Sequence, residues 1–195
     1  MDGNAKRHQT EPKMSTTDPH PLPFAALQAL DESGFVTRLG GVVELSPWVV
    51  QRAWQRRPFA SREAVFEALA GCIRSAPLDE QLALLRAHPE LAGREAVAGT
   101  MTPESNAEQG RLGLLALSHA DWHRLDTLNA RYRERFGFPF LVALRLHASL
   151  ASVFDSFERR LNNDPAQERD EALGQVCEVM RGRLERTLAE AEASA

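Results

Sequence analysis

The stretch PAQERDEALGQVCEVMRGRLERTL, residues 165–188, decides the fold class. Its apolar residues recur at intervals of three and four, and the main ones are Leu173, Val176, Met180, Leu184 and Leu188. This spacing places them on one face of an α-helix and leaves most charged residues on the other faces. The sequence therefore predicts a long amphipathic helix after Pro165.

Three further stretches show the same helical spacing of apolar residues. They are Phe24, Leu27 and Leu30; Val65, Phe66, Leu69 and Ile73; and Leu125, Leu128, Tyr132 and Phe136. Ser61 stands where the second stretch needs an N-cap, and Ser46 directly precedes Pro47, the usual order at a helix start. Gly137 follows the third stretch at the position where a left-handed residue commonly ends a helix.

Signals for β-strands are scarce in this chain. The one β-like run, Phe140-Leu-Val-Ala-Leu144, fits the start of a buried helix equally well. We therefore expect an all-α fold, a compact irregular bundle of seven or eight helices forming a single domain over residues 23–195. Residues 1–22 are polar and rich in proline, which predicts a disordered N-terminal arm.

Composition narrows the class of protein. The chain has 195 residues, 43% of them hydrophobic, and a formal net charge of -4, which disfavours a uniformly basic surface for nucleic acid. No apolar run approaches the roughly 18 residues that span a bilayer. The start also lacks the apolar segment of a secretory signal. Because Cys72 and Cys177 are too few for a disulfide framework, we expect a soluble, cytoplasmic protein.

His88 is the first candidate for chemistry. It precedes Pro89, and because a residue before proline avoids helical geometry, its imidazole is expected at a helix C-terminus. The negative end of the helix dipole favours imidazolium there, so we expect a raised pKa that suits a proton shuttle at neutral pH. The alternative, which this motif alone favours, is a charged histidine that only caps the last carbonyl groups of the helix.

The string Ser105-Asn-Ala-Glu-Gln109 is the second candidate. Ser105 and Glu108 match the capping box S-x-x-E, in which each side chain bonds to the other residue's backbone N–H, and the motif alone favours that structural role. In the functional alternative, Ser105, Glu108 and Gln109 lie in the first turns of a helix. There they would face a polar ligand together with free backbone N–H groups.

Two other features admit a structural and a functional interpretation. The string Phe136-Gly-Phe-Pro-Phe140 is either a buried corner or a turn that leaves backbone N–H and C=O groups free in an apolar pocket. Arg181 and Arg183 alternate with apolar Leu184, so at least one of the two can point inward. A buried arginine would need an anion, either a carboxylate of the protein or one of a substrate.

Signals for metals and cofactors are weak. His119 and His123 have the i, i+4 spacing of a metal pair, but position 120 is Ala where H-E-x-x-H requires Glu. A solvated helix face is the favoured interpretation for these histidines, as it is for Arg131, Arg133 and Arg135. The chain contains no Gly-rich phosphate loop, no G-x-S-x-G elbow and no CxxC, so no cofactor is expected.

Taken together, nine strings in chain order resemble the 2-oxo-4-hydroxy-4-carboxy-5-ureidoimidazoline (OHCU) decarboxylase family, over roughly residues 24–190. The strings are Ser46-Pro47-Trp48, Arg57-Pro58-Phe59, Asp79-Glu80-Gln81-Leu82, His88-Pro89-Glu90-Leu91-Ala92-Gly93, Ser105-x-x-Glu108-Gln109, Leu128-Asn129-x-x-Tyr132, Phe136-Gly-Phe-Pro-Phe140, Arg160-Leu161-x-Asn163 (or its neighbour Asn162) and Arg183-Leu184. The ordered set reverses the preference for purely structural roles of His88 and Glu108.

The resemblance implies an all-α homodimer without a cofactor that converts OHCU, a small-molecule substrate of urate degradation, into (S)-allantoin and CO2. His88 matches the catalytic histidine that donates the proton, and we expect Glu108 to orient it or the ureido group. The matching substrate-binding residues are Pro89, Ser105, Glu108, Gln109, Phe140, Leu141, Val142, Ala143, Leu144 and Arg183. Two departures from the family pattern are Glu90, where Asp is expected, and the run after Phe140.

Three other functions remain open at this point. A paralogue with the same site would act on another ureido or carboxy heterocycle. A noncatalytic helical interaction module would explain every apolar stretch. A metal-dependent hydrolase would use His119, His123 and either Asp121 or Glu108.

Overall fold

The structure is a computed structural model that describes residues 21–93, 96 and 98–189. Over these residues it contains nine α-helices and one short 3-10 helix, and no strand. The helices are α1 (Phe24–Ala29), α2 (Glu32–Leu39), α3 (Pro47–Trp54), α4 (Arg62–Arg74), α5 (Leu78–Ala87), α7 (Pro103–Arg111), α8 (His119–Phe136), η1 (Leu144–Leu146), α9 (Leu150–Arg160) and α10 (Pro165–Thr187). The all-α prediction is confirmed, with nine α-helices in the described part where seven or eight were expected.

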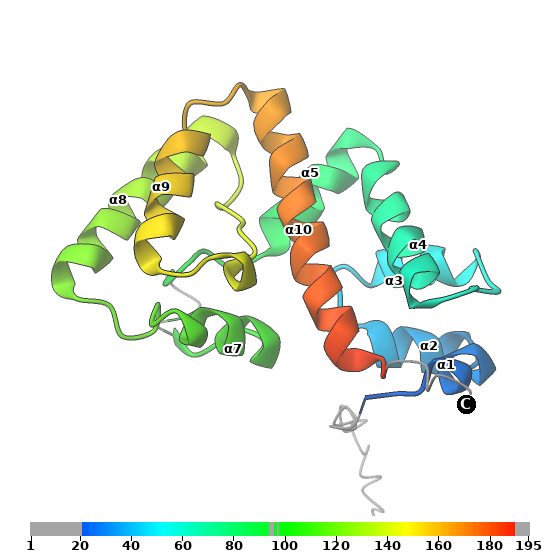
Figure 1. Cartoon of the computed structure of the whole chain (residues 1–195). Coiled ribbons are helices and arrows are strands. Elements are labelled where there is room, and N and C mark those ends of the chain that lie inside the picture. The colour runs from blue at the N-terminus through cyan, green and yellow to red at the C-terminus, as the bar shows by residue number, and fades with distance from the viewer. Residues whose placement is uncertain (1–20, 94–95, 97, 190–195) are drawn as a thin grey trace, which may run out of the picture.

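Helix α10 is the central element (Figure 1), running between a group formed by α8 and α9 and a group formed by α1 to α4. It contacts α2, α4, α5, α8 and η1. The five apolar residues of the predicted stripe are all buried. Asp164 begins the helix by accepting hydrogen bonds from the N–H groups of Ala166 and Gln167. The long amphipathic helix expected after Pro165 is therefore confirmed, and it joins the two groups of helices.

The predicted helix boundaries are mostly confirmed by cap geometry. Ser61 accepts a hydrogen bond from the Ala64 N–H at the start of α4, and Ser46 precedes Pro47 at the start of α3. Gly137 ends α8 with φ 75°, the left-handed conformation that a residue without Cβ adopts at little cost. Near the N-terminus, Phe24 and Leu27 of the expected stripe lie in α1 and Leu30 is its C-cap, and Asp31 then caps α2 through the Gly34 N–H.

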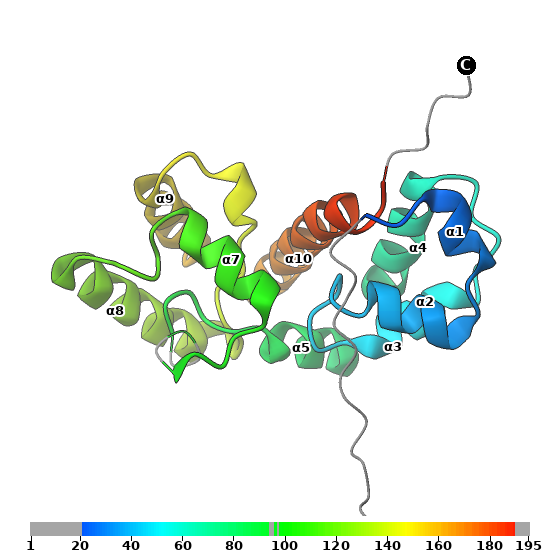
Figure 2. The same cartoon turned by 90° about the horizontal axis from the view of Figure 1, so that it is seen from below.

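The β-like run after α8 is neither a strand nor a helix. Residues 139–143 are irregular and extended, and the 3-10 helix η1 follows them. The expected alternatives were therefore both wrong, because the hydrogen bonds of this backbone go to side chains from other elements. Figure 2 shows the segment and η1 beside α7 and α10, seen from below.

The ends of the described chain lie side by side. The Leu22 N–H donates to the Thr187 carbonyl at 2.8 Å, and the Ala189 N–H donates to the Leu22 carbonyl at 2.9 Å. Leu22, at the end of the predicted arm, thus pairs with the segment that follows α10. Residues 1–20 of that arm lie outside the described residues. In the described part of the chain, no helix has both the length and the apolar character needed to cross a membrane.

Candidate active site

A pocket lies where α10, α7 and the C-terminal end of α5 meet the loop before α3 and the extended segment before η1. Its lining residues are Glu44, His88, Pro89, Leu91, Ser105, Glu108, Gln109, Phe140, Leu141, Val142, Ala143, Leu144, Arg145, Val176, Val179, Arg183 and Arg186. Every residue that the family resemblance placed in a site is among them. The fold thus gathers five separate segments of sequence around one hollow.

His88 follows the last turn of α5, as its position before Pro89 predicts. Its backbone is extended (ψ 144°), and its Nδ1 lies 2.9 Å from the Leu84 carbonyl oxygen. Because a carbonyl oxygen only accepts, Nδ1 carries the proton when the ring is neutral. Nε2 then keeps its lone pair. The ring on the pocket wall is therefore set up to take a proton.

The expected direction of the His88 pKa shift was wrong. Burial lowers the pKa of the imidazole, and this effect outweighs the opposite effects of the Leu84 hydrogen bond and the carboxylates of Glu44 and Glu108. The helix dipole depends only on the helix that carries His88, whereas the burial of the ring depends on what the rest of the chain packs around it. A neutral imidazole at neutral pH follows.

Gln109 holds the loop that follows His88. It is 4% exposed, its Oε1 accepts from the Ala92 N–H at 2.8 Å, and its Nε2 donates to the Glu90 carbonyl at 3.3 Å. Ala92 has φ 46°, a strained conformation for a residue with a Cβ, which the bond from Gln109 supports. The carboxylate of Glu90 points away from the pocket and pairs with Arg133 on α8. Gln109 thus lines the pocket, while its amide group bonds to the loop.

The N-terminus of α7 differs from the predicted capping box. Thr102 is the N-cap and accepts from the Ser105 N–H, with Pro103 in the first turn. The capping role of Ser105 was therefore wrong, because the cap lies three residues earlier. Ser105 sits inside the first turn, where it is buried and its hydroxyl donates to Glu44 at 2.5 Å.

Glu44 comes from the loop between α2 and α3 and was not expected in the site. It is 4% exposed, and its two carboxylate oxygens accept from Thr102 and Ser105, each at 2.5 Å. Burial alone would raise the pKa of this carboxyl, but the hydrogen bonds and the charge of Arg183 outweigh it and lower the pKa. Glu44 is therefore an anion at neutral pH.

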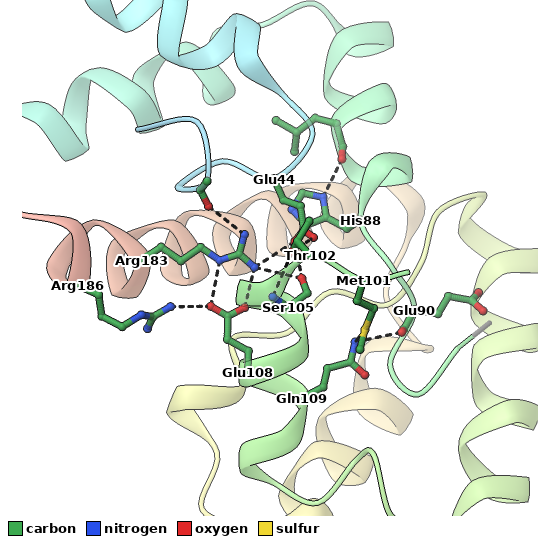
Figure 3. A network of polar contacts seen from close by, with 12 residues as sticks. Glu44, His88, Glu90, Met101, Thr102, Ser105, Glu108, Gln109, Arg183 and Arg186 are labelled. Atoms are coloured by element: carbon green, nitrogen blue, oxygen red, sulfur yellow. Dashed lines mark hydrogen bonds and ion pairs between the residues drawn. The ribbon is translucent and has the colours of Figure 1, made fainter. Parts of the chain in front are cut away.

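Arg183 crosses the pocket from α10 to both acids (Figure 3). Its Nε and Nη2 donate to the two carboxylate oxygens of Glu108 at 3.0 and 2.7 Å, and Nη2 also lies 3.1 Å from Glu44. Burial alone would lower the pKa of the guanidinium, but Glu108 and Glu44 outweigh it and raise the pKa. We call Glu44, Glu108 and Arg183 the pocket cluster. Within it, Arg183 pairs with carboxylates of the protein. The sequence had left open whether its partner is a carboxylate of the protein or one of a substrate.

Arg186 adds a second positive charge at the edge of the pocket. It lies one turn after Arg183 and donates to Glu108 at 3.0 Å, with 58% of its side chain exposed. Two carboxylates therefore face two guanidinium groups around the hollow. The charges of these four side chains balance before any ligand enters.

The extended segment forms the apolar side of the pocket. Residues 140–144 are all buried, and they line the pocket together with Val176 and Val179 of α10. The N–H groups of Leu141 and Val142 have no hydrogen-bond partner among the described residues. The free backbone groups thus follow the string Phe136–Phe140, in which one of the two interpretations of the sequence placed them, and groups of this kind in an apolar setting can orient a heterocycle.

Three charged residues of the pocket were missed from the sequence: Glu44, Arg145 and Arg186. One usable signal was an acid inside the apolar run Val42-Val43-Glu44-Leu45, because a lone carboxylate among apolar residues is rarely buried without a partner. Another was the spacing of Arg183 and Arg186, which puts both side chains near one face of a helix.

The histidine pair lies elsewhere. His119 and His123 are exposed on the first turns of α8, with ring centroids 4.5 Å apart, and neither lines the pocket. Asp121 accepts a hydrogen bond from the Ser118 hydroxyl. Within the described ranges, no group of three or more His, Cys, Asp or Glu residues is placed to hold a metal ion. Arg131, Arg133 and Arg135 are exposed, as predicted.

Comparison with known proteins gives a consistent result. The family model described as OHCU decarboxylase matches residues 28–185. A 2-oxo-4-hydroxy-4-carboxy-5-ureidoimidazoline decarboxylase of Mus musculus is 40% identical over 163 residues, which are 84% of this chain and 91% of the relative. A second enzyme with the same name, from Bos taurus, is 40% identical over 84% of this chain and 96% of its own length.

A solved structure has the same fold. The crystal structure of (S)-allantoin synthase superposes with a TM-score of 0.69 at 24% sequence identity, covering 86% of this chain and 54% of that one. At this identity the likeness supports the all-α architecture alone.

Proposed function

The chain belongs to the OHCU decarboxylase family, and we propose that it converts OHCU into (S)-allantoin and CO2 in the pocket lined by His88. It is on this basis a carboxy-lyase of urate degradation. The observation that carries the proposal is the geometry of His88, which lines the pocket with its Nδ1 2.9 Å from the Leu84 carbonyl oxygen, while burial lowers the pKa of the ring. A ring fixed in this way presents one basic nitrogen for proton transfer.

The substrate supplies its own electron sink, since its carboxylate and hydroxyl sit on one ring carbon beside a C=N bond. When the bond to the carboxylate breaks, its electron pair enters the ring and the C=N nitrogen takes up a proton. The product of this step is an enol with CO2 released. The enol becomes the ketone when the hydroxyl proton leaves and a proton reaches the neighbouring carbon, so one proton is consumed overall.

We assign the transfer between these two positions to His88. Nε2 accepts the hydroxyl proton and returns a proton to the neighbouring carbon from the same side. Because the ring stands on one wall of the pocket, the proton arrives on one face, which fixes the handedness of allantoin. General acid–base help of this kind contributes about 10²–10⁴ in rate.

The pocket cluster limits how Arg183 can bind the substrate. Since Arg183 is already paired with Glu44 and Glu108, its charge is not free to hold the substrate carboxylate by itself. We assign the carboxylate to the apolar side of the pocket near Val142 and Val176, where poor solvation favours its conversion to neutral CO2. Glu108, 25% exposed, is the member of the cluster placed to accept from the ureido N–H groups.

The experiment that tests the reaction supplies OHCU freshly, made in the cuvette from urate by urate oxidase and hydroxyisourate hydrolase, with no added metal. Circular dichroism then follows the product. Rapid formation of one allantoin enantiomer is the expected result. Slow racemic allantoin at the rate without protein would contradict the proposal and point to a paralogue that acts on another ureido or carboxy heterocycle.

We also propose that the protein is a cytoplasmic homodimer. Support for the compartment comes from Cys72 and Cys177, which are both free and buried, with burial raising the pKa of each thiol. Support for a dimer comes from large apolar side chains at the surface, among them Leu45 at 66%, Leu146 at 56% and Leu78 at 54% exposure. Light scattering should give twice the chain mass at all working concentrations, and a monomer mass would contradict the dimer.

A further inference from the structure

A second group of charges is buried behind the pocket, and the reaction described above does not use it. Arg160 at the end of α9 and Glu168 on α10 are both 0% exposed. The Nε and Nη2 of Arg160 donate to one oxygen of Glu168 at 2.9 and 2.5 Å, and the Asn163 amide donates to the other at 2.7 Å. Tyr132 also donates its hydroxyl proton to Glu168. We call Arg160, Glu168, Tyr132 and Asn163 the sealed cluster.

One bond from the sealed cluster reaches the pocket wall. The Nη1 of Arg160 donates to the Leu141 carbonyl at 2.6 Å, and the guanidinium lies 4.5 Å from the centre of the Phe140 ring. Phe140 and Leu141 both line the pocket, whereas Arg160 does not. The Arg160 side chain thus connects the buried ion pair with Glu168 to the backbone of the pocket wall.

That backbone depends on side chains for its position. Residues 139–143 belong to no helix or sheet, so no regular ladder of hydrogen bonds fixes them. Two other side chains hold the same stretch: Gln175 accepts from the Ala143 N–H at 2.9 Å, and Arg111 donates to the Leu144 carbonyl at 2.9 Å. Arg111 is exposed and Gln175 partly so, whereas Arg160 is enclosed and its planar fork is fixed by Glu168.

Stability alone gives a weak reason for this arrangement. Replacing a buried ion pair by apolar residues of similar volume is often neutral or stabilising, because both charges lose their hydration. A methionine pair would fill the space of Arg160 and Glu168, but it could not donate to the Leu141 carbonyl.

We propose that Arg160 is a positioning residue for the decarboxylation, acting through the Leu141 carbonyl to hold the pocket wall of residues 140–144 at the distance that grips the substrate. The inference rests on the proposed function for its effect on turnover. Its effect on the wall does not depend on the substrate.

The main variant is the double change Arg160→Met with Glu168→Met, which removes both charges and leaves neither unpaired. Looser grip on the substrate raises KM, and we expect about a tenfold increase with kcat within about threefold of the parent. Loss of folded protein would do the opposite, because it lowers the apparent kcat and leaves KM unchanged. Parent values of both constants in a folded double variant would overturn the proposal.

A second variant covers the case in which the double variant does not fold. Arg160→Lys keeps the buried charge opposite Glu168, but one ammonium group cannot reproduce the fork that reaches both Glu168 and Leu141. It should show a smaller rise in KM in the same direction. An unchanged KM in this variant would also overturn the proposal. Arg124→Met is the matched control, since Arg124 on α8 is exposed and pairs with Glu158 on α9 outside the sealed cluster, and it should keep both constants.

Amide hydrogen exchange separates this proposal from the proposed function. In the Arg160 variants, exchange of the hydrogen-bonded amides of Ala143 and Leu146 in this segment should accelerate about tenfold or more, while α10 and the Arg124→Met control keep the parent rates. Unchanged exchange in this segment would overturn the proposal whatever the substrate. If the parent fails to decarboxylate OHCU, the proposed function fails, and the exchange result still decides whether Arg160 holds the wall.

Discussion

The sealed cluster and the pocket cluster are both largely buried, and α10 contributes a charged residue to each. They differ in how far solvent can reach them. In the sealed cluster Arg160 and Glu168 are 0% exposed, and every oxygen of the acid has a partner from the protein. In the pocket cluster Arg183 is 3% exposed, yet Glu108 keeps 25% of its side chain open to the hollow. Water and ligand can reach one cluster and not the other. An arginine paired with a carboxylate can therefore hold the backbone in the sealed cluster, and a similar pair can contact a substrate in the pocket cluster.

The largest effect on stability is expected from removing only one partner of the buried ion pair in the sealed cluster. Glu168→Leu would remove the buried partner of Arg160 and leave only the part-exposed Glu171, 3.7 Å from its Nε, as a counter-charge. Breaking a buried ion pair from one side typically costs about 3–5 kcal/mol. Urea unfolding should show the loss as a lower midpoint. A variant within 1 kcal/mol of the parent would show that the cluster is not sealed from water.

The same kind of change in the pocket cluster should affect turnover more than stability. Glu44→Gln keeps the shape but removes a negative charge and one acceptor, and we expect a loss of about 1–2 kcal/mol in unfolding free energy. Arg183 would lose part of its neutralisation and shift toward Glu108, so kcat/KM should fall by about tenfold or more. Parent kcat/KM would mean that the balance of charges in the pocket is not needed.

The pH dependence sharpens the comparison, because the pocket is lined by a histidine whereas the sealed cluster has none. Burial lowers the pKa of His88 below its ordinary value of 6.5. Activity that needs the neutral ring should therefore persist below pH 6.5, with the acid limb of kcat/KM at a lower pH. An acid limb above pH 6.5 would contradict the account.

The same shift has a consequence for stability. Between the lowered pKa of the folded state and about 6.5, the unfolded chain binds more protons at His88 than the folded chain. This contribution is therefore complete above pH 6.5 and is lost as the pH falls through that interval. His88→Ala should reduce this part of the slope of unfolding free energy against pH.

The smallest effect is expected from a surface pair on the same helix. Arg181, two residues before Arg183, makes a two-bond ion pair with Glu63, whose side chain is 59% exposed. Arg181→Gln should change the unfolding free energy by less than about 1 kcal/mol and leave kcat/KM unchanged. A larger effect on turnover would show that charge anywhere on α10 influences the pocket.

Local patterns predicted most of the helices. The stripe through Val176 and Met180 and the left-handed Gly137 depend only on neighbours within a few residues, so the sequence contains the full signal. The run after Phe140 was not predictable in this way. Its conformation is set by Arg160 and Gln175, which follow it in the chain and meet it only in the folded protein.

Most residues of the site could be predicted from the sequence, but their ion-pair partners and pKa shifts could not. The family resemblance assigned His88, Glu108 and Arg183 to one site. Glu44 was missed because it lies 139 residues before its partner Arg183 and belongs to no recognisable motif. The pKa of His88 was misjudged for the same reason, because the dipole of α5 is a local effect and burial is not. Long-range contacts decide both.

The central claim, that His88 transfers the proton, is tested most directly by the initial rate of (S)-allantoin formation in His88→Ala, measured by circular dichroism beside its urea unfolding curve. The account predicts a rate lower by about 10²–10⁴, racemic residual product, and a helical spectrum and cooperative unfolding transition like those of the parent. A folded His88→Ala variant that forms (S)-allantoin near the parent rate would contradict it.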